Sequence, residues 1–344
     1  YSDRHRNISS RKNKCIIFVR SAFCSMVNTL KKIGLCFFLF LGISVFLVLF
    51  SAGCDLFEVS FHDPQLENCI REEINIFDRN LIRKDLSTII SLDLAGKNIS
   101  NISGLEEASS LESLYLGDNN LVDISPLAKL ENLWELDLHS NKIIDISPLA
   151  KLRKLENLYL FDNKISNPSP LRKLENLLVL DLQGNMIRDI TGLVELTDLL
   201  NLNLNNNRIY DIKVLENLLH LTELNLGNND IRDVSSLENI TCLWNLDISN
   251  NYVIDISPLH NLSNLRKLDL SQNRIHDISP LAAVTGLREL RLAGNEVRDV
   301  SFLAEMKSLE FLSLSLKNSI DLSPLENIQH LRIYDQTSPQ IITF

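Results

Sequence analysis

The sequence lacks the residue clusters on which enzymes and metalloproteins depend. Its 344 residues contain no Gly-rich phosphate-binding loop and no cluster of Cys and His at metal-ligand spacing. His139 stands two residues after Asp137, but no Ser or Cys nucleophile occupies a matching position. We therefore expect no catalytic activity, no cofactor and no bound metal.

Cysteine is scarce as well. Of the six cysteines, only Cys69 and Cys242 follow residue 54. They lie roughly seven 22-residue units apart, and each unit advances the chain by about 5 Å, so no disulfide can join them. Cys69 is therefore interpreted as a small buried apolar residue.

An excess of positive charge is also missing from most of the chain. The net charge is −10, yet residues 1–53 carry eight Lys and Arg against one Asp, which leaves −17 on residues 54–344. A body this acidic repels phosphate backbones, so nucleic acid is an unfavourable partner. A protein with a basic or mixed surface fits better.

A 22-residue repeat dominates what is present. The same Asn recurs at this spacing without any insertion, at Asn119, Asn141, Asn163, Asn185, Asn207, Asn229, Asn251, Asn273 and Asn295. In the unit Leu133 to Leu152, seven apolar residues are spaced so that they can point inward. Leu136-Asp137-Leu138 alternates like a short strand, and stacked units would pair these strands into one parallel sheet. The Asn side chains are expected to form a buried structural ladder.

Each unit also contains a turn signal. Asp145-Ile146-Ser147-Pro148-Leu149 recurs with small changes, and Ser followed by Pro favours a short helical turn. The recurring Asp is interpreted as a turn and cap residue rather than a calcium ligand, because neighbouring carboxylates come from different units.

The first unit is preceded by a predicted helical cap. Asp63-Pro64 is a good helix start, and the apolar stripe of Leu66, Cys69, Ile70, Ile74 and Phe77 predicts a helix over about 64–76. A second helical turn is expected around Asp85-Leu86. At the other end the repeat fades, although Leu331 and Tyr334 keep its register, and residues 331–344 are predicted to form one strand that caps the array.

The amino-terminal region indicates export. Residues 33–53 are apolar, follow Lys31 and Lys32, and end in small residues before Cys54. This favours a cleaved secretory signal, with an uncleaved signal anchor as the alternative. The predicted organisation is a non-native upstream extension (1–25), a signal peptide or anchor (26–53), a linker and helical cap (54–88), eleven repeats (89–330) and a partial repeat (331–344).

Two family resemblances follow from these motifs. Phe50-Ser51-Ala52-Gly53-Cys54 resembles the lipobox of bacterial lipoproteins, which implies lipidation of Cys54 and a membrane tether. The repeat Leu-x-x-Leu-x-Leu-x-x-Asn-x-Ile-x-Asp-Ile-Ser-Pro-Leu resembles that of internalin-type bacterial surface proteins. That resemblance implies an α/β fold, a right-handed curved leucine-rich-repeat solenoid with one parallel sheet on the concave face and short 3₁₀ turns on the convex face. It also implies a protein-binding function such as adhesion or binding of a host receptor.

An alternative function comes from the same repeat. The leucine-rich regulatory subunits of Ser/Thr phosphatases have a similar 22-residue unit, which would make the protein an intracellular regulatory scaffold. The apolar segment before Cys54 favours export over this alternative.

The side chains between the inward leucines should face the concave side and contact a partner. The candidate binding residues are Tyr115, Trp134, Asp137, His139, Tyr159, Phe161, Asp181, Asn203 and Trp244. Aromatic residues beside carboxylates are typical of a surface that binds Lys or Arg of a partner. The alternative is that these aromatics only stabilise the sheet through cross-strand contacts.

Overall fold

A single sheet runs through the repeats in chain order. The computed structural model describes residues 57–316, 320–337 and 340–343. Val59–Phe344 form one unit, in which the sheet has 13 strands ordered β1 to β13. The strands are β1 (Ser91–Asp93), β2 (Ser113–Tyr115), β3 (Glu135–Asp137), β4 (Asn157–Tyr159), β5 (Val179–Asp181), β6 (Asn201–Asn203), β7 (Glu223–Asn225), β8 (Asn245–Asp247), β9 (Lys267–Asp269), β10 (Glu289–Arg291), β11 (Phe311–Leu314), β12 (Arg332–Asp335) and β13 (Gln340–Thr343).

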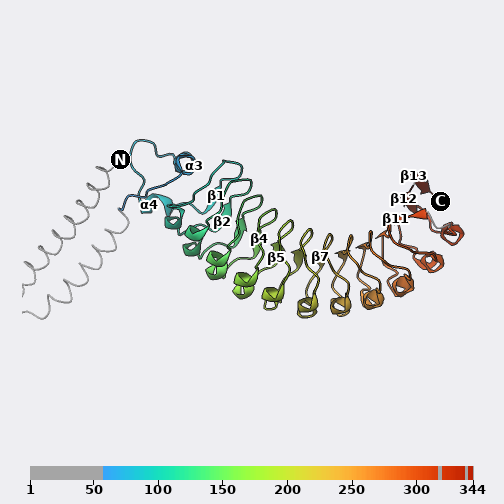
Figure 1. Ribbon diagram of the computed structural model, residues 1–344. Coiled ribbons are helices and arrows are strands. Elements are labelled where there is room, and N and C mark those ends of the chain that lie inside the picture. The colour runs from blue at the N-terminus through green and yellow to red at the C-terminus, as the bar shows by residue number, and fades with distance from the viewer. Residues whose placement is uncertain (1–56, 317–319, 338–339, 344) are drawn as a thin grey trace, which may run out of the picture. The chain divides into compact units, whose positions relative to one another are not determined.

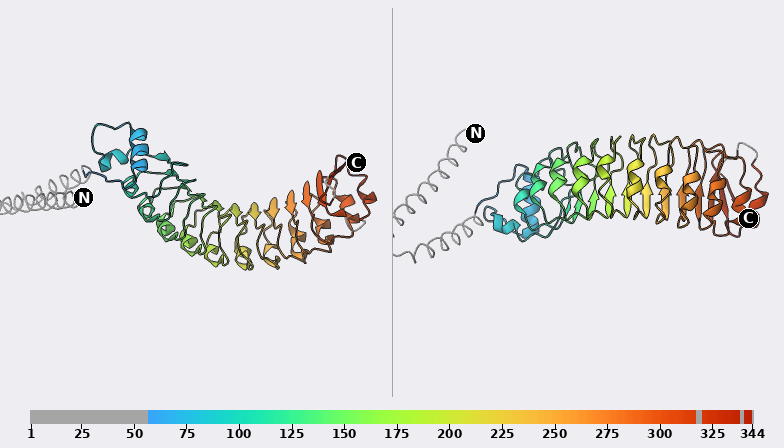
Figure 2. Two further views of the ribbon diagram at one scale, coloured as in Figure 1. Left: turned by 45° about the horizontal axis from the view of Figure 1, so that its top comes forward. Right: turned by 90° about the horizontal axis from the view of Figure 1, so that it is seen from below.

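Each strand from β1 to β11 pairs in parallel with the next, as the repeat predicts. After each strand the chain crosses to a short 3₁₀ turn and returns. These turns are Leu105–Glu107, Ser125–Lys129, Ser147–Lys151, Ser169–Lys173, Thr191–Leu193, Lys213–Asn217, Ser235–Leu237, Ser257–Asn261, Ser279–Ala283, Ser301–Glu305 and Ser323–Leu325. Within this unit the strands line the concave side and the turns line the convex side (Figures 1 and 2). The structure therefore confirms the predicted leucine-rich-repeat solenoid.

The core is one continuous stack of aliphatic side chains between the sheet and the turns. All seven inward positions of the Leu133 coil are almost fully buried, and the same positions are buried in its neighbours. Burying one such side chain stabilises a fold by about 1.5 to 3 kcal/mol. Pro168, which replaces Ile at one of these positions, is also buried.

The repeated Asn side chains join neighbouring coils by hydrogen bonds. Asn185 is 7% exposed, and its Nδ2 donates to the backbone carbonyls of Leu160, Leu182 and Gln183 at 3.0 to 3.2 Å. Its Oδ1 accepts the backbone N–H of Ile165 at 2.9 Å. One amide thus makes hydrogen bonds to four backbone groups and joins its own coil to the coil before it.

The predicted cap helix is α3 (Pro64–Ile74), and the second helical turn is α4 (Arg83–Leu86). The helix ends two residues earlier than predicted because Asn75 adopts a left-handed conformation with φ 54°. Leu66, Cys69 and Ile70 are buried against the first coils, as expected. Phe77 was wrongly placed on this stripe, since it lies beyond the helix and is 64% exposed.

Asp63 connects the cap helix to the repeats. Its Oδ1 accepts the backbone N–H of Gln65 at 2.9 Å, which caps α3. Its Oδ2 accepts the backbone N–H of Ser100 at 2.9 Å, so the same carboxylate holds the first coil. Burial would raise the pKa of Asp63, but the backbone hydrogen bonds outweigh burial and lower it.

The carboxyl-terminal end differs from the prediction of a single strand. It is a pair of strands, because β13 turns back and pairs antiparallel with β12. The register also shifts: Leu312 pairs with Ile333, one residue short of the 22-residue spacing. This shorter coil places Ile333 in the core and leaves Tyr334 half-exposed, so Tyr334 does not keep the inward position.

The predictions about the amino-terminal segment lie outside the described residues. They are the upstream extension, the apolar run of residues 33–53 and the lipidation of Cys54. Among the residues that the structure does describe, none belongs to a helix with the length and apolarity needed to span a bilayer.

Candidate functional site

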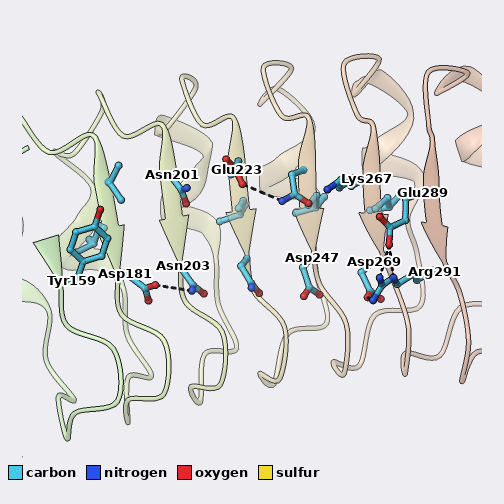
Figure 3. A pocket seen from close by; sticks show the side chains of 17 residues that line it. Tyr159, Asp181, Asn201, Asn203, Glu223, Asp247, Lys267, Asp269, Glu289 and Arg291 are labelled. Atoms are coloured by element: carbon cyan, nitrogen blue, oxygen red, sulfur yellow. Dashed lines mark hydrogen bonds and ion pairs between the residues drawn. The ribbon is translucent and has the colours of Figure 1, made fainter. Parts of the chain in front are cut away.

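Three rows of side chains cross the concave face. In each central strand the middle residue is buried, and the first and third residues point out of the sheet (Figure 3). These two positions form the first two rows, and the third row consists of the second residue after the end of each strand. Because the units repeat every 22 residues, side chains of one row stand on neighbouring strands about 5 Å apart.

An aromatic strip lies at the amino-terminal part of this face, on β2 to β4 and the residues that follow them. We define it by Tyr115, His139, Tyr159 and Phe161, all half-exposed. The rings of His139 and Phe161 stack with centroids 4.5 Å apart and an interplanar angle of 12°. The Tyr115 hydroxyl donates to Oε2 of Glu135 at 2.5 Å, and this hydrogen bond to a carboxylate raises the pKa of Tyr115 to about 12.

Carboxylates hold the orientation of the His139 ring. Its Nδ1 lies 2.7 Å from Oδ1 of Asp137, and its Nε2 lies 3.2 Å from Oδ2 of Asp118 on the preceding coil. Burial disfavours the imidazolium, but the hydrogen bonds and charges of the two carboxylates outweigh it and raise the pKa of His139. The stack on Phe161 and these two contacts fix the ring before any partner arrives.

A shallow groove continues from the strip over β4 to β10 (Figure 3). One row of its lining consists of carboxylates and amides, namely Asp181, Asn203, Asn225, Asp247 and Asp269. Nδ2 of Asn203 donates to Oδ2 of Asp181 at 3.0 Å, and each of Asp247 and Asp269 accepts the backbone N–H two residues ahead at 2.8 Å.

Burial and mutual repulsion make the ionised form of the groove carboxylates less favourable. Burial raises the pKa of Asp181, and the carboxylates of Asp162 and Asp137 add to the effect. Burial, with the carboxylate of Asp247 next to it, also raises the pKa of Asp269. A cation bound in the groove would relieve this repulsion, so the site is electrostatically suited to Lys or Arg.

The far end of the groove carries charges of both signs. Arg291 contacts Oε1 of Glu289 at 2.6 Å and Oδ2 of Asp269 at 3.8 Å. Lys267 also lines the groove, and its Nζ lies 5.8 Å from the centre of the Trp244 ring. The acidic part of the groove is therefore bounded by two cations.

The predicted binding residues do not form one patch. Tyr115, Asp137, His139, Tyr159 and Phe161 lie together, and Asp181 and Asn203 line the groove beside them. Trp134 and Trp244 each precede a strand and are 37% exposed. Trp244 directly precedes β8, beside Lys267 and away from the aromatic strip.

Sequence reasoning missed the first residue of each strand. Glu223, Asn245, Lys267 and Glu289 line the groove from that position. The signal was available, because the residue before an inward Leu points outward just as the residue after it does. Among the described residues, no group of three or more His, Cys, Asp or Glu could hold a metal ion.

Comparisons with known proteins agree with the geometry. The family of leucine-rich repeats in two copies matches residues 109–151, 153–195 and 245–283. A search of curated protein sequences found no match. Among solved structures, the chain is similar to an internalin (InlF) from Listeria monocytogenes, with 32% identity, a TM-score of 0.67, and coverage of 79% of this chain and 88% of that one.

Two more distant structures share the fold. The functional domain of InlJ from Listeria monocytogenes is 22% identical with a TM-score of 0.64, covering 79% of this chain and 66% of that one. A TDR receptor is 23% identical with a TM-score of 0.65, covering 74% and 48%. The internalin-like repeat fold is a protein–protein interaction module. Given its repeats and its likeness to InlF over most of both chains, the protein belongs to the internalin-type leucine-rich-repeat proteins.

Proposed function

We propose that this protein is an exported binding module that holds a protein partner with a basic or mixed surface on its concave face. The observation that supports this most is the acidic groove over β4 to β10, which continues from the aromatic strip on one rigid sheet. The strip would supply desolvated anchors, and the carboxylates would set charge specificity.

The pattern of charge favours a partner that is not uniformly basic. Asp181, Asp247 and Asp269 would each face a Lys or Arg, whereas Lys267 and Arg291 at the far end would face a carboxylate. Groups at the rim of such an interface affect the association rate, and groups at its centre affect dissociation.

Removing two groove charges tests this function. In the variant Asp247→Asn with Asp269→Asn, we expect about tenfold weaker binding of a protein partner and a smaller effect of salt, because two cation-pairing groups are lost. The partner is first selected on an array of secreted and cell-surface protein domains, and its affinity is measured at two salt concentrations.

A matched control removes the same charge elsewhere. Asp255 and Asp277 accept backbone N–H groups of the turns, and Asn167 makes the same contact with Ser169 at 3.0 Å in its own coil. Asp255→Asn with Asp277→Asn should therefore fold and bind normally. Equal loss of affinity in both variants, or none in either, would contradict binding in the groove.

We further propose that lipid on Cys54 tethers the module to a membrane, where it acts in adhesion or binds a host receptor. The apolar run before Cys54 and the small residues next to it support this proposal. Metabolic labelling with a fatty-acid analogue should mark the wild-type protein and Cys69→Ala, but not Cys54→Ala. Label that persists in Cys54→Ala, or protein found only in cytosol, would refute lipidation at this residue.

A further inference from the structure

A second exposed surface lies on the side of the coils where the chain leaves the Asn ladder. The first and third residues after each ladder Asn point outward, with a buried Ile, Leu or Val between them. Backbone hydrogen bonds fix neighbouring coils here, as from Arg208 N–H to Ile187 O at 2.8 Å and from Tyr252 N–H to Ile231 O at 2.9 Å. Residues of the same row on successive coils are therefore neighbours.

We call the central part of this surface the Arg–Tyr flank. It is defined by Arg188, Arg208, Tyr210, Arg232, Tyr252 and Arg274.

Large apolar side chains are exposed on this flank. Tyr210 is 66% exposed and Tyr252 is 38% exposed, and Met186 and Ile254 in the same two rows are 43% and 60% exposed. Single exposed apolar residues are common on protein surfaces. A group on successive coils, interspersed with Arg, has instead the composition of a protein interface, where Tyr, Met and Arg are enriched.

The guanidinium groups of the flank are free to bind. Tyr252 lies between two of them, with Cζ of Arg232 and Arg274 at 5.7 and 5.0 Å from its ring centre. Within residues 57–316, 320–337 and 340–343, none of the four arginines of the flank forms an ion pair or a side-chain hydrogen bond. The cation–π contacts hold two guanidiniums in place while their N–H donors still face solvent.

Carboxylates also occur near the flank, and their positions favour one class of partner over others. Asp230 stands between Arg208 and Tyr252 in its row. Behind the rows, Asp211 and Asp233 accept the backbone N–H of Lys213 and Ser235 at 2.9 Å. Binding to a lipid surface or a nucleic acid depends on the net charge of a surface within about one Debye length, which is about 10 Å. Over that distance these carboxylates offset the positive charge of the arginines. A protein can instead place single carboxylates against single guanidiniums in bidentate contact.

We propose that the Arg–Tyr flank is a second interaction surface, separate from the concave face, that binds an acidic, partly apolar segment of a protein partner. The flank supplies four unpaired guanidiniums for Asp or Glu and the exposed rings of Tyr210 and Tyr252 for apolar side chains. The charged groups that define it are guanidiniums, whereas those of the concave groove are mainly carboxylates. The two surfaces can therefore hold different segments at the same time.

A displayed random-peptide library, selected against the full chain, tests this proposal. Selected peptides should be enriched in Asp and Glu next to an apolar residue. Their affinity, measured by fluorescence anisotropy on synthetic copies, should fall at least about tenfold in Tyr252→Ala with Arg274→Ala, because a stacked ring and a bidentate donor are lost. The groove variant Asp247→Asn with Asp269→Asn should bind these peptides as the wild type does.

The matched control is Lys142→Ala with Lys164→Ala, which removes two positive charges from the same side of the solenoid but outside the Arg–Tyr flank. It should keep at least half of the wild-type affinity. Peptides without acidic enrichment, or equal losses in the control, would overturn the proposal. The proposal would also be overturned if no peptide bound the protein and vesicles with 30% phosphatidylserine bound it in a way that depends on Arg274. Circular dichroism and thermal unfolding verify that each variant is folded.

Discussion

Replacing Asn185 with Ala is expected to lower the free energy of unfolding of the repeat array by about 3 to 5 kcal/mol. The amide makes four hydrogen bonds to backbone groups of its own coil and of the coil before it. Alanine would leave the N–H of Ile165 without a partner, which costs about 1 to 3 kcal/mol. It would also remove one of two hydrogen bonds from each of the three carbonyls, at about 0.5 to 1.5 kcal/mol for each bond. Water entering the vacated space would recover part of this loss.

The position of the defect decides how unfolding proceeds. Each coil contacts only its neighbours, so the stability of a solenoid is nearly a sum of coil and interface energies. A weak interface near Asn185 should let the two halves of the array unfold at different urea concentrations. The same change at Asn295, close to the carboxyl-terminal end, should only detach the last coils and leave the main transition almost unchanged.

Urea unfolding followed by circular dichroism, together with hydrogen exchange of individual segments, measures both effects. Asn132→Ala is the control, because Asn132 is exposed and its Nδ2 donates to the carbonyl of Ser109 at 2.9 Å. It should cost less than about 1 kcal/mol. If Asn185→Ala were no more destabilising than Asn132→Ala, the ladder would not contribute to stability as its hydrogen bonds indicate.

The fold could be predicted because each coil repeats the same physical constraints. Leu136 and Leu138 point inward because their strand alternates, and Asn141 is buried because the turn leaves backbone groups that only an amide can satisfy. These rules need no knowledge of distant contacts. They fail where the repeat fails, as at β12, where a coil one residue shorter moves Ile333 to the inward position.

The concave face was only partly predictable, since its contacts depend on side-chain conformations across different coils. Nothing in the local sequence shows that Tyr115 bonds to Glu135, or that His139 stacks on Phe161 rather than extending into solvent. The groove depends on the side chains of seven strands together, including Lys267, whose contact with Trp244 no repeat rule indicates. Periodicity predicts which residues face a partner, but not which of them act together.

The aromatic strip should dominate the affinity for the partner of the concave face. In the variant Tyr115→Ala, Tyr159→Ala and Phe161→Ala, we expect binding to weaken at least about 100-fold, since a buried aromatic anchor contributes about 2 kcal/mol or more. The three side chains point away from the core, so the array should remain folded. Loss of the Tyr115–Glu135 contact should cost no more than about 1 kcal/mol.

Single variants distinguish residues that contact the partner from residues that hold a neighbouring side chain in place. Phe161 carries the stacked ring of His139, so Phe161→Ala should also release that ring and weaken binding more than Tyr159→Ala alone. Phe161→Leu keeps apolar surface without the stack and should fall between them. Phe77→Ala, which removes an exposed aromatic of the cap, should leave the affinity unchanged. If the triple variant kept wild-type affinity while Asp247→Asn with Asp269→Asn lost it, these aromatics would only stabilise the sheet, and the groove alone would bind the partner.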